Sequence, residues 1–406
     1  MARTIVVIGG GPAAVFAALE AKKRDAAAEV MLLTEEACEP YEKPPLSKAV
    51  LTGKAKPEDA PIAGPGGLAK HGVIVKFNTR CTAIDRTAHE AVTAAGRQRY
   101  DTLVIATGSL MRELPMLPPG MERVHYLRTE THARALKAGL ASCRQLVVVG
   151  AGLIGLEVAA SAAELGNIEV TVLEVAPRIM ARVSDDETGA MILAQHERHG
   201  VEIELGSTVT QVTPQLDGHL ALETADGDIH VAEQIVVGTG VKPDDALAAA
   251  AGLKVQDGIA VDAQCRTSDP DIFAAGDCTR FPGLQGLVRL ENWRHAQDHG
   301  VIAGRNAAGG SDVYTAVPSF WSEQYDLYIQ GVGWPDPSAQ RVRRPLPDKS
   351  ALLLEVRDGV IGYALGINAQ RDLAAVRRLI ERKIPVDPVV LANPAQPFNA
   401  MLKAKV

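Results

Sequence analysis

Two stretches of the chain share one pattern of apolar and polar positions. The first, residues 4–36, opens with a short apolar run, passes through a glycine-rich turn into an Ala- and Leu-rich segment, and closes with a second apolar run at residues 30–33. Short apolar runs bounded by glycine are typical of strands buried on both faces of a parallel sheet. The pattern therefore predicts a strand, a helix and a second strand in this order.

The turn of the first stretch has the spacing Gly9-x-Gly11-x-x-Ala14, and Glu35 follows the second apolar run. In such a turn the first glycine permits a tight bend, the second lets backbone amides approach a pyrophosphate, and a small third residue keeps helix and strand close. The helix N-terminus adds partial positive charge. A carboxylate at Glu35 can accept hydrogen bonds from a ribose diol. We therefore predict a dinucleotide site here.

The second stretch, residues 145–174, repeats the unit. An apolar run leads into Gly150-x-Gly152-x-x-Gly155, a helical segment extends to about residue 165, and the next apolar run ends at Glu174. Because strand, turn, helix, second strand and acid occur in order both times, we predict two nucleotide sites in one chain.

Glu174 also bears on the choice of coenzyme. A carboxylate in this place bonds a free 2′-hydroxyl and repels a 2′-phosphate, which favours NADH over NADPH. Arg178 and Arg182 are near enough in sequence to complicate this choice, because arginine is the residue that NADP sites use. We expect the charge of Glu174 to dominate.

Length and composition set further bounds. The chain has 406 residues, which predicts two or three domains, and its formal net charge of −7 argues against nonspecific nucleic-acid binding. The longest apolar stretch, residues 146–163, is interrupted by glycines and Glu157, so it predicts a strand and a helix and no membrane span. The first predicted strand starts at residue 4, which leaves no room for a signal peptide and predicts a cytoplasmic protein.

The cysteines carry no recognisable dithiol or disulfide pattern. The five of them are scattered, and no two have the C-x-x-C spacing: Cys38, Cys81, Cys143, Cys265 and Cys278. This pattern favours a reducing compartment without a disulfide framework. We expect Cys278 to be a small buried residue. No spacing of His, Cys, Asp and Glu indicates a metal site.

A further motif is Pro40-Tyr-Glu-Lys43-Pro44-Pro45-Leu-Ser-Lys48. The paired prolines predict a rigid, extended segment that fixes the position of Lys48. The motif resembles the P-Y-x-R-P-P-L-S-K signature of FAD-dependent NADH:ferredoxin reductases, the putidaredoxin reductase type that serves aromatic-ring dioxygenases and some cytochromes P450. The resemblance implies that Lys48 lies beside the flavin N5 edge. Lys43 stands where the family has arginine, so any bidentate contact with FAD is lost there.

Other motifs follow in the family's order. Residues 106–108 resemble its A-T-G element, residues 127–129 its L-R-T crossover, and residues 267–277 its T-x-x-P-x-I-x-A-x-G-D flavin signature. Residues 291–300 resemble E-x-W-x-x-A-x-x-x-G, and residues 320–324 resemble F-W-S-D-Q with glutamate in place of aspartate. The resemblance implies FAD-binding roles for Gly9, Gly11, Ala14, Glu35, Lys43, Pro44, Thr107, Gly108, Arg128, Asp277, Trp293 and Trp321, and NAD-binding roles for Gly150, Gly152, Gly155, Glu174, Gly240 and Glu291.

Two residues are implied to act in catalysis. If the family geometry holds, Glu157 lies one turn into the second helix and pairs with Lys48 beside the flavin. Helix stabilisation at the N-terminus is the alternative role for Glu157. Trp321 could lie at the exposed flavin edge where electrons leave, or pack a domain seam.

The resemblance implies an α/β fold of the glutathione-reductase type. It has two Rossmann-like dinucleotide-binding domains and a smaller α+β C-terminal interface domain. We expect an FAD-binding domain at residues 1–112 and 241–318, an NADH-binding domain at residues 113–240, and the interface domain at residues 319–406.

The implied function is hydride transfer from NADH to FAD, followed by single-electron transfer to a [2Fe–2S] ferredoxin. Because the chain itself is net negative, docking of an acidic ferredoxin would need a local basic patch, with five candidate residues: Arg289, Arg294, Arg341, Arg343 and Arg344. Two alternatives share the architecture. One is a single-cysteine NADH oxidase, peroxidase or coenzyme A disulfide reductase, for which Cys38 before Pro40-Tyr41 is the candidate. The other is a redox sensor of the apoptosis-inducing-factor type.

Overall fold

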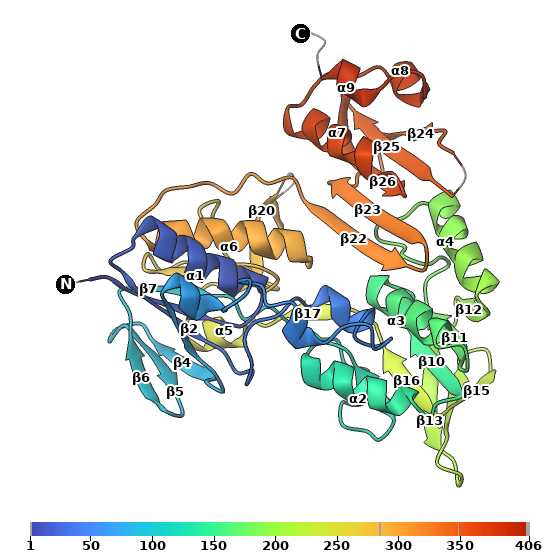
Figure 1. Ribbon diagram of the computed structural model, residues 1–406, viewed down its shortest axis with the longest axis horizontal. Coiled ribbons are helices and arrows are strands. Elements are labelled where there is room, and N and C mark those ends of the chain that lie inside the picture. The colour runs from blue at the N-terminus through green and yellow to red at the C-terminus, as the bar shows by residue number, and fades with distance from the viewer. Residues whose placement is uncertain (1, 284–285, 348, 403–406) are drawn as a thin grey trace. The chain divides into compact units, whose positions relative to one another are not determined.

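The computed structural model describes residues 2–283, 286–347 and 349–402. These residues form two compact units. The first unit comprises Met1–Pro45, Lys56–Arg112 and Val241–Ala316, and the second comprises Leu46–Ala55, Glu113–Gly240 and Val317–Val406. Figure 1 shows the course of the chain through both.

The first unit is built on a five-stranded parallel sheet in the order β19-β7-β1-β2-β3. The two apolar runs predicted at residues 4–8 and 30–33 form strands of this sheet, and both are almost completely buried. The strands are β1 (Thr4–Ile8), β2 (Glu29–Leu33), β3 (Val73–Lys76), β7 (Thr102–Ile105) and β19 (Ile272–Ala274).

Two helices pack together in this unit, α1 (Pro12–Arg24) and α6 (Trp293–Ala307). They approach closely, because a Cβ added at Gly300 would lie 2.3 Å from the carbonyl oxygen of Ala13. This contact fixes the start of α1, where the first glycine turn ends. Smaller elements complete the unit: α5 (Ala246–Ala250), β4 (Cys81–Asp85), β5 (Glu90–Thr93), β6 (Gly96–Arg99), β8 (Ser109–Met111), β17 (Val241–Pro243), β18 (Ile259–Ala260), β20 (Thr279–Gly283) and β21 (Gly286–Val288).

The second unit repeats the design with a parallel sheet in the order β12-β11-β10-β16-β9. Its strands are β9 (Val124–Tyr126), β10 (Gln145–Val149), β11 (Glu169–Glu174), β12 (Val201–Leu205) and β16 (Gln234–Val237), and its helices are α2 (Glu130–Leu140), α3 (Leu153–Glu164) and α4 (Asp186–Arg198). An antiparallel sheet of β13 (Val209–Pro214), β14 (Leu220–Thr224) and β15 (Ile229–Ala232) adjoins it. A turn at Asp226-Gly227 joins β14 to β15, and Gly227 has φ +89° there.

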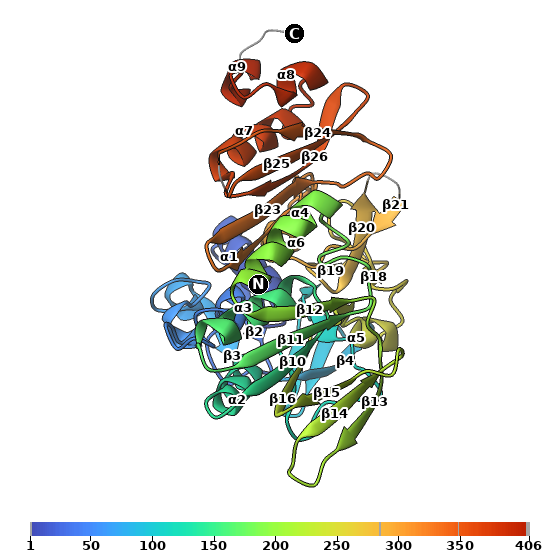
Figure 2. The ribbon, with the colours of Figure 1, turned by 90° about the vertical axis from the view of Figure 1, so that its right-hand side faces the viewer.

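The C-terminal part of the second unit is an antiparallel sheet in the order β22-β23-β26-β25-β24. Its strands are β22 (Ser319–Gln324), β23 (Leu327–Gly333), β24 (Gln340–Arg344), β25 (Ala351–Arg357) and β26 (Val360–Ile367). The helix α7 (Gln370–Glu381) packs against this sheet, followed by α8 (Pro388–Ala392) and α9 (Phe398–Met401) (Figure 2). One core continues from Val148 and Leu156 to Ile329 and Leu353, so this sheet and the parallel sheet share their interior.

The predicted α/β class, with two Rossmann-like sheets and an α+β C-terminal part, is confirmed by this architecture. The extended conformation predicted for the paired prolines is wrong. Pro44–Ser47 forms a short 3₁₀ helix, η1. Proline fixes φ at about −65°, which suits the start of a 3₁₀ turn as well as an extended segment, and the buried side chains of Leu46 and Ser47 select the turn.

The segment at residues 53–72 contains two further short 3₁₀ helices, η2 (Pro57–Asp59) and η3 (Leu68–His71). Leu68 within it is fully buried in the core of the first unit. Among the helices that the structure describes, none is long and apolar enough to cross a membrane.

Candidate functional site

The predicted nucleotide-binding residues gather at the carboxyl ends of parallel strands. In the first unit Gly9 follows β1, Glu35 follows β2, Thr107 follows β7 and Gly276 follows β19. Because neighbouring parallel strands end at the same edge of a sheet, these residues lie along one edge. This is the edge at which doubly wound α/β sheets bind ligands.

The first glycine turn has the shape that a pyrophosphate needs. Gly9 has φ +135°, and a Cβ there would lie 2.2 Å from the carbonyl oxygen of Ala106. Gly11 is the N-cap of α1 without a side-chain cap, and a Cβ added to it would meet nothing within 4 Å. The first turn of α1 therefore begins beside open space that a phosphate can fill. Ala14 is completely buried between helix and strand, as predicted.

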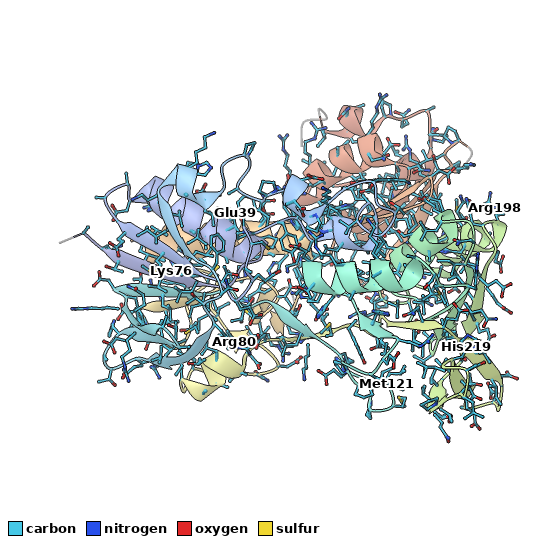
Figure 3. All side chains as sticks on the ribbon, turned by 60° about the horizontal axis from the view of Figure 1, so that its bottom comes forward. Glu39, Lys76, Arg80, Met121, Arg198 and His219 are labelled. Carbon is cyan, nitrogen blue, oxygen red and sulfur yellow. The ribbon has the colours of Figure 1, made fainter. Side chains whose placement is uncertain are left out.

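Two neighbouring acids follow β2, and they point in different directions. Glu35 is 61% exposed and pairs with Arg80 at 3.2 Å, on the surface where Figure 3 labels Arg80. Glu36 is 22% exposed and accepts hydrogen bonds from the Tyr41 hydroxyl at 2.6 Å and from Lys43 Nζ at 3.0 Å. Lys43 is therefore engaged in an ion pair with Glu36, a residue of its own unit. The ribose role of Glu35 stays a prediction, and Glu36 is a second candidate that sequence reasoning missed.

The second glycine turn lies at the same edge of the other parallel sheet. A Cβ at Gly155 would lie 2.0 Å from the carbonyl oxygen of Gly150, so helix α3 starts in close contact with the turn. Gly152 is the N-cap of α3, also without a side-chain cap, and its nearest neighbour is 4.0 Å from an added Cβ. Gly240 lies three residues after the end of β16 and has φ +100°.

Glu174 ends β11 with both carboxylate oxygens held. Oε2 accepts a hydrogen bond from the backbone amide of Ala151 at 2.6 Å, and Oε1 accepts one from Ala176 at 2.8 Å. The acid is thus fixed against the glycine turn. Arg178 points elsewhere, because its guanidinium contacts Asp186 at 3.1 Å and the carbonyl oxygen of Ala181 at 3.0 Å. Arg178 is therefore engaged within its own segment, and the dominance of Glu174 in the choice of coenzyme stays a prediction.

Asp277, to which the resemblance gives an FAD-binding role, accepts a hydrogen bond from Ser109 Oγ at 3.0 Å. Thr107 donates to the carbonyl oxygen of Asp244 at 2.6 Å, and Asp244 in turn donates its amide to Gly108 at 3.0 Å. These bonds join the end of β7 to the return of the chain into the first unit. Cys278, next to Asp277, is fully buried, and burial raises the pKa of its thiol to about 11, so it behaves as the predicted structural residue.

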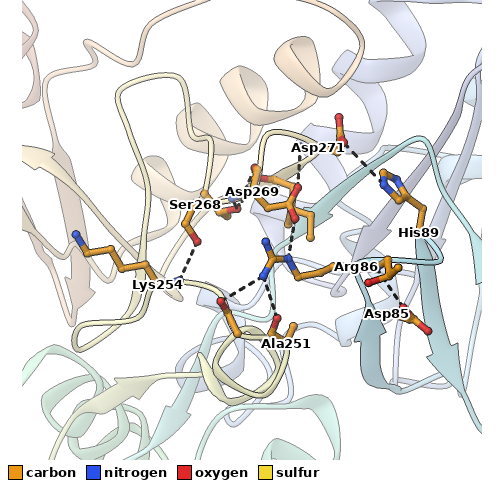
Figure 4. Close-up of polar contacts among 12 residues, drawn as sticks. Asp85, Arg86, His89, Ala251, Lys254, Ser268, Asp269 and Asp271 are labelled. Atoms are coloured by element: carbon orange, nitrogen blue, oxygen red, sulfur yellow. Dashed lines mark hydrogen bonds and ion pairs between the residues drawn. The ribbon is translucent and has the colours of Figure 1, made fainter.

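The loop that leads into the flavin signature is anchored by Arg86 (Figure 4). Arg86 Nε donates to Asp269 at 2.7 Å, and Nη1 donates to the carbonyl oxygens of Ala251 and Gly252 at 3.4 Å. One guanidinium thus connects the end of β4, the end of α5 and the loop before β19. This fixes the approach of the chain to Gly276 and Asp277.

The Gly276 peptide is held on both sides by buried groups. Its amide donates to His299 Nδ1 at 3.2 Å, and its carbonyl oxygen accepts from Thr279 Oγ1 at 2.7 Å. His299 is completely buried, and burial lowers the pKa of its imidazole to about 3. Burial also lowers the pKa of the neighbouring His295 well below its ordinary value. Both rings are therefore neutral in the folded protein.

These buried histidines predict a loss of stability in mild acid. In the unfolded chain each titrates near pH 6.5, so as pH falls below that value the unfolded state binds protons that the folded state does not. We expect the free energy of unfolding to fall as pH drops from 7.5 to 5, by up to about 1.4 kcal/mol per pH unit for each such residue. Urea titrations across this range measure it. His299→Asn should flatten the dependence, whereas His71→Asn, at an exposed position, serves as the matched control; equal slopes in both variants would contradict the assignment.

Trp293 and Glu291 lie at the start of α6. The Trp293 ring meets Phe16 edge to face, with centroids 6.1 Å apart, and Glu291 pairs with Arg289 at 2.8 Å. Burial raises the pKa of the nearby Glu42, and a hydrogen bond with Trp293 partly offsets that effect. Their cofactor roles remain predictions. The other predicted contacts, Pro44 in η1, Arg128 beyond β9 and Trp321 on β22, are half-buried.

Lys48 and Glu157 meet within the second unit, as the resemblance implies. Lys48 Nζ donates to Glu157 Oε2 at 3.0 Å. The Lys48 side chain is 18% exposed and that of Glu157 only 3%. Glu157 also accepts hydrogen bonds from Ser47 Oγ on the same oxygen and from Ser322 Oγ on Oε1 at 2.7 Å. Three donors therefore converge on one buried carboxylate, and the ion pair among them fixes the position of Lys48 Nζ.

Comparisons with known proteins agree with this geometry. Residues 3–300 match the family model described as pyridine nucleotide-disulphide oxidoreductase, and residues 319–402 match the one described as reductase C-terminal. The ferredoxin–NAD(+) reductase component of an anthranilate 1,2-dioxygenase system from Burkholderia cepacia is 36% identical over 402 residues, 98% of each chain. Rhodocoxin reductase from Rhodococcus erythropolis is 36% identical over 96% of this chain and 92% of that one.

The solved structures give the same result. The covalent complex of putidaredoxin reductase with putidaredoxin contains a chain that superposes with a TM-score of 0.93 at 30% identity, covering 99% of both chains. The chain therefore belongs to the pyridine nucleotide-disulphide oxidoreductase family, among the ferredoxin reductases that its sequence motifs predicted.

Proposed function

We propose that the protein is an NADH-dependent, FAD-containing reductase that passes electrons to a [2Fe–2S] ferredoxin of a dioxygenase or cytochrome P450 system. One observation carries this proposal: a relative named as a ferredoxin–NAD(+) reductase component matches the chain over 98% of both lengths. FAD, when bound, supplies a ring that accepts a hydride from NADH and releases electrons one at a time.

Different residues of the chain are proposed to bind FAD and NADH. In the first unit the Gly9–Gly11 turn would hold the FAD pyrophosphate, and Asp277 would bind the ribityl hydroxyls. In the second unit the Gly150–Gly152 turn would hold the pyrophosphate of NADH, and Glu174 would bind its ribose. The open space at Gly11 and at Gly152 supports both assignments, because a phosphate could approach the backbone there. We keep the three domains expected from the sequence as part of this proposal.

Lys48 and Glu157 are proposed to act as a charged pair at the flavin site. Glu157 restricts the side chain of Lys48 through the 3.0 Å ion pair. A fixed positive charge favours the negative charge that a ring gains on reduction. This role requires no acid–base residue.

Docking of a ferredoxin cannot use all the arginines predicted for it. Arg344 is 5% exposed, its guanidinium lies 4.3 Å from the Phe398 ring centroid, and it donates to the carbonyl oxygens of Leu391, Pro394 and Gln396, so the prediction is wrong for this residue. The other four have acidic partners within the chain. Arg289 pairs with Glu291 and Asp257, Arg294 with Asp298, Arg341 with Glu355, and Arg343 with Asp185 and Glu187.

Stopped-flow mixing tests the proposed function. The FAD-loaded protein should be bleached by NADH faster than by NADPH, and the reduced protein should then reduce a [2Fe–2S] ferredoxin.

Glu174→Gln should narrow the preference for NADH by about tenfold, because the charge that repels a 2′-phosphate is gone. Cys38→Ser should reduce the ferredoxin at the wild-type rate. Failure of NADH to reduce the flavin, or loss of activity in the Cys38 variant, would overturn the proposal.

A further inference from the structure

The carboxylate of Glu157 is the end of a longer series of buried side chains. Ser322 Oγ contacts Glu157 Oε1 at 2.7 Å, Gln324 Nε2 contacts Ser322 Oγ at 3.1 Å, and Gln324 Oε1 contacts His196 Nε2 at 2.9 Å. The hydroxyl of Tyr325 lies 3.3 Å from His196 Nδ1. The series joins α3, β22, α4 and the turn after β22, all within the second unit.

Every member of this series except Tyr325 is almost inaccessible to water. The exposed fractions are 3% for Glu157, 0% for Ser322, 1% for Gln324 and 0% for His196. Buried polar groups need partners, because an unsatisfied donor or acceptor in such surroundings costs about 1–3 kcal/mol. The pairing of β22 with β23 brings such partners together, because Ser322 and Gln324 lie two residues apart and therefore on the same face of β22.

The charge of Glu157 fixes the direction of every bond. An ionised carboxylate only accepts hydrogen bonds, so Ser322 must donate to it, and the Ser322 oxygen is then available to accept from Gln324. This orients the Gln324 amide with its nitrogen toward Ser322 and its oxygen toward His196. His196 must therefore carry its proton on Nε2, which leaves Nδ1 to accept from the Tyr325 hydroxyl.

The protonation states of the two outer groups agree with this direction. Burial lowers the pKa of His196 to about 4, so the ring is neutral at physiological pH and keeps one acceptor nitrogen. Burial raises the pKa of Tyr325, so its hydroxyl keeps the proton that it donates. The Tyr325 ring is held in place by stacking on His199, with centroids 3.8 Å apart and an interplanar angle of 10°.

We propose that Tyr325, His196, Gln324 and Ser322 form a one-way hydrogen-bond chain that fixes the carboxylate of Glu157 in place and thereby positions Lys48. Hydrogen bonds in series polarise one another, and each donor in the chain strengthens the next. The four are positioning residues, because they act on Lys48 only through Glu157. The consequence for catalysis rests on the proposed function of the Lys48–Glu157 pair.

The same hairpin provides a matched control. Gln195, next to His196 on α4, donates to Asp326 at 2.6 Å in the hairpin turn. Like the hydrogen-bond chain, Gln195 anchors the hairpin to α4. Among the hydrogen bonds of the described residues, however, it makes none with Ser322, Gln324 or Glu157. Gln195→Ala therefore removes anchoring alone. Tyr325→Phe keeps the stacked ring and removes only the first donor.

Stopped-flow reduction of the FAD-loaded protein by NADH separates positioning from anchoring. The limiting rate should fall about tenfold in Ser322→Ala, less in Gln324→Leu and least in Tyr325→Phe, with the dissociation constant of NADH unchanged. Gln195→Ala should react at the wild-type rate. An equal loss in Gln195→Ala and Gln324→Leu, or no loss in Ser322→Ala, would overturn the proposal.

A second measurement does not depend on catalysis. Nitrogen NMR of histidine-labelled FAD-loaded protein, assigned with His196→Gln, should show His196 protonated on Nε2, and Gln324→Leu should change that tautomer. Gln195→Ala should leave it unchanged. If the His196 ring of the wild-type protein were protonated on Nδ1, the proposed hydrogen-bond chain would be refuted, even if NADH reduces the flavin. Conversely, the Nε2 tautomer in a protein that NADH does not reduce would refute only the proposed function.

Discussion

A Gly11→Val variant is expected to fold normally and to retain no FAD. Gly11 has φ −94° and ψ −177°, an extended conformation that valine adopts without strain, and an added Cβ would meet nothing within 4 Å. The new side chain would instead fill the space over the first turn of α1 in which we place the pyrophosphate. Visible absorbance of the purified protein gives the FAD content, and circular dichroism reports the fold.

Two comparison variants make this result specific. Gly9→Ala should destabilise the protein itself, because φ +135° and a contact of 2.2 Å with the Ala106 carbonyl oxygen leave no room for a side chain. Gly152→Val, at the matching N-cap of α3, should keep FAD bound and abolish reduction by NADH. A full complement of FAD in Gly11→Val would show that the pyrophosphate does not lie at this turn.

The second large effect is expected from Glu157→Leu. Removing the carboxylate leaves Lys48 Nζ, Ser47 Oγ and Ser322 Oγ without their shared acceptor in a buried place. We expect the free energy of unfolding to fall by about 3 kcal/mol, the cost typical of breaking one side of a buried ion pair. Reduction by NADH should slow by about a hundredfold, because the positive charge of Lys48 is no longer held in place. Urea denaturation and stopped-flow absorbance measure the two effects.

The same helix offers the control for this variant. Glu164, on α3, pairs with Lys54 at 2.9 Å, but the side chains are 37% and 68% exposed. Glu164→Gln should change the free energy of unfolding by less than about 1 kcal/mol, because surface ion pairs contribute little. If Glu157→Leu were as stable and as fast as Glu164→Gln, the pair with Lys48 would have no special role.

The sequence alone determined the two glycine turns and the strands around them. Strand, turn and helix in each unit depend on neighbouring residues: apolar runs that suit a buried parallel strand, glycines that permit the bend, and small residues that let the helix pack closely. These requirements are local, so Gly9, Gly11, Gly150, Gly152 and the acid at the end of β11 could be placed before any contact between distant residues was known. The meeting of Lys48 with Glu157 came from a family motif and not from spacing.

Only the tertiary structure decided what depends on residues far apart in the chain. The paired prolines form part of a 3₁₀ helix because Leu46 and Ser47 are buried. After β2, Glu35 contacts Arg80. Its neighbour Glu36 contacts Tyr41 and Lys43. Besides Lys48 and Ser47, Glu157 bonds Ser322 on β22, 165 residues later in the chain. No local pattern marks a serine or a glutamine for such a bond, because its direction follows from the charge that the fold buries beside it.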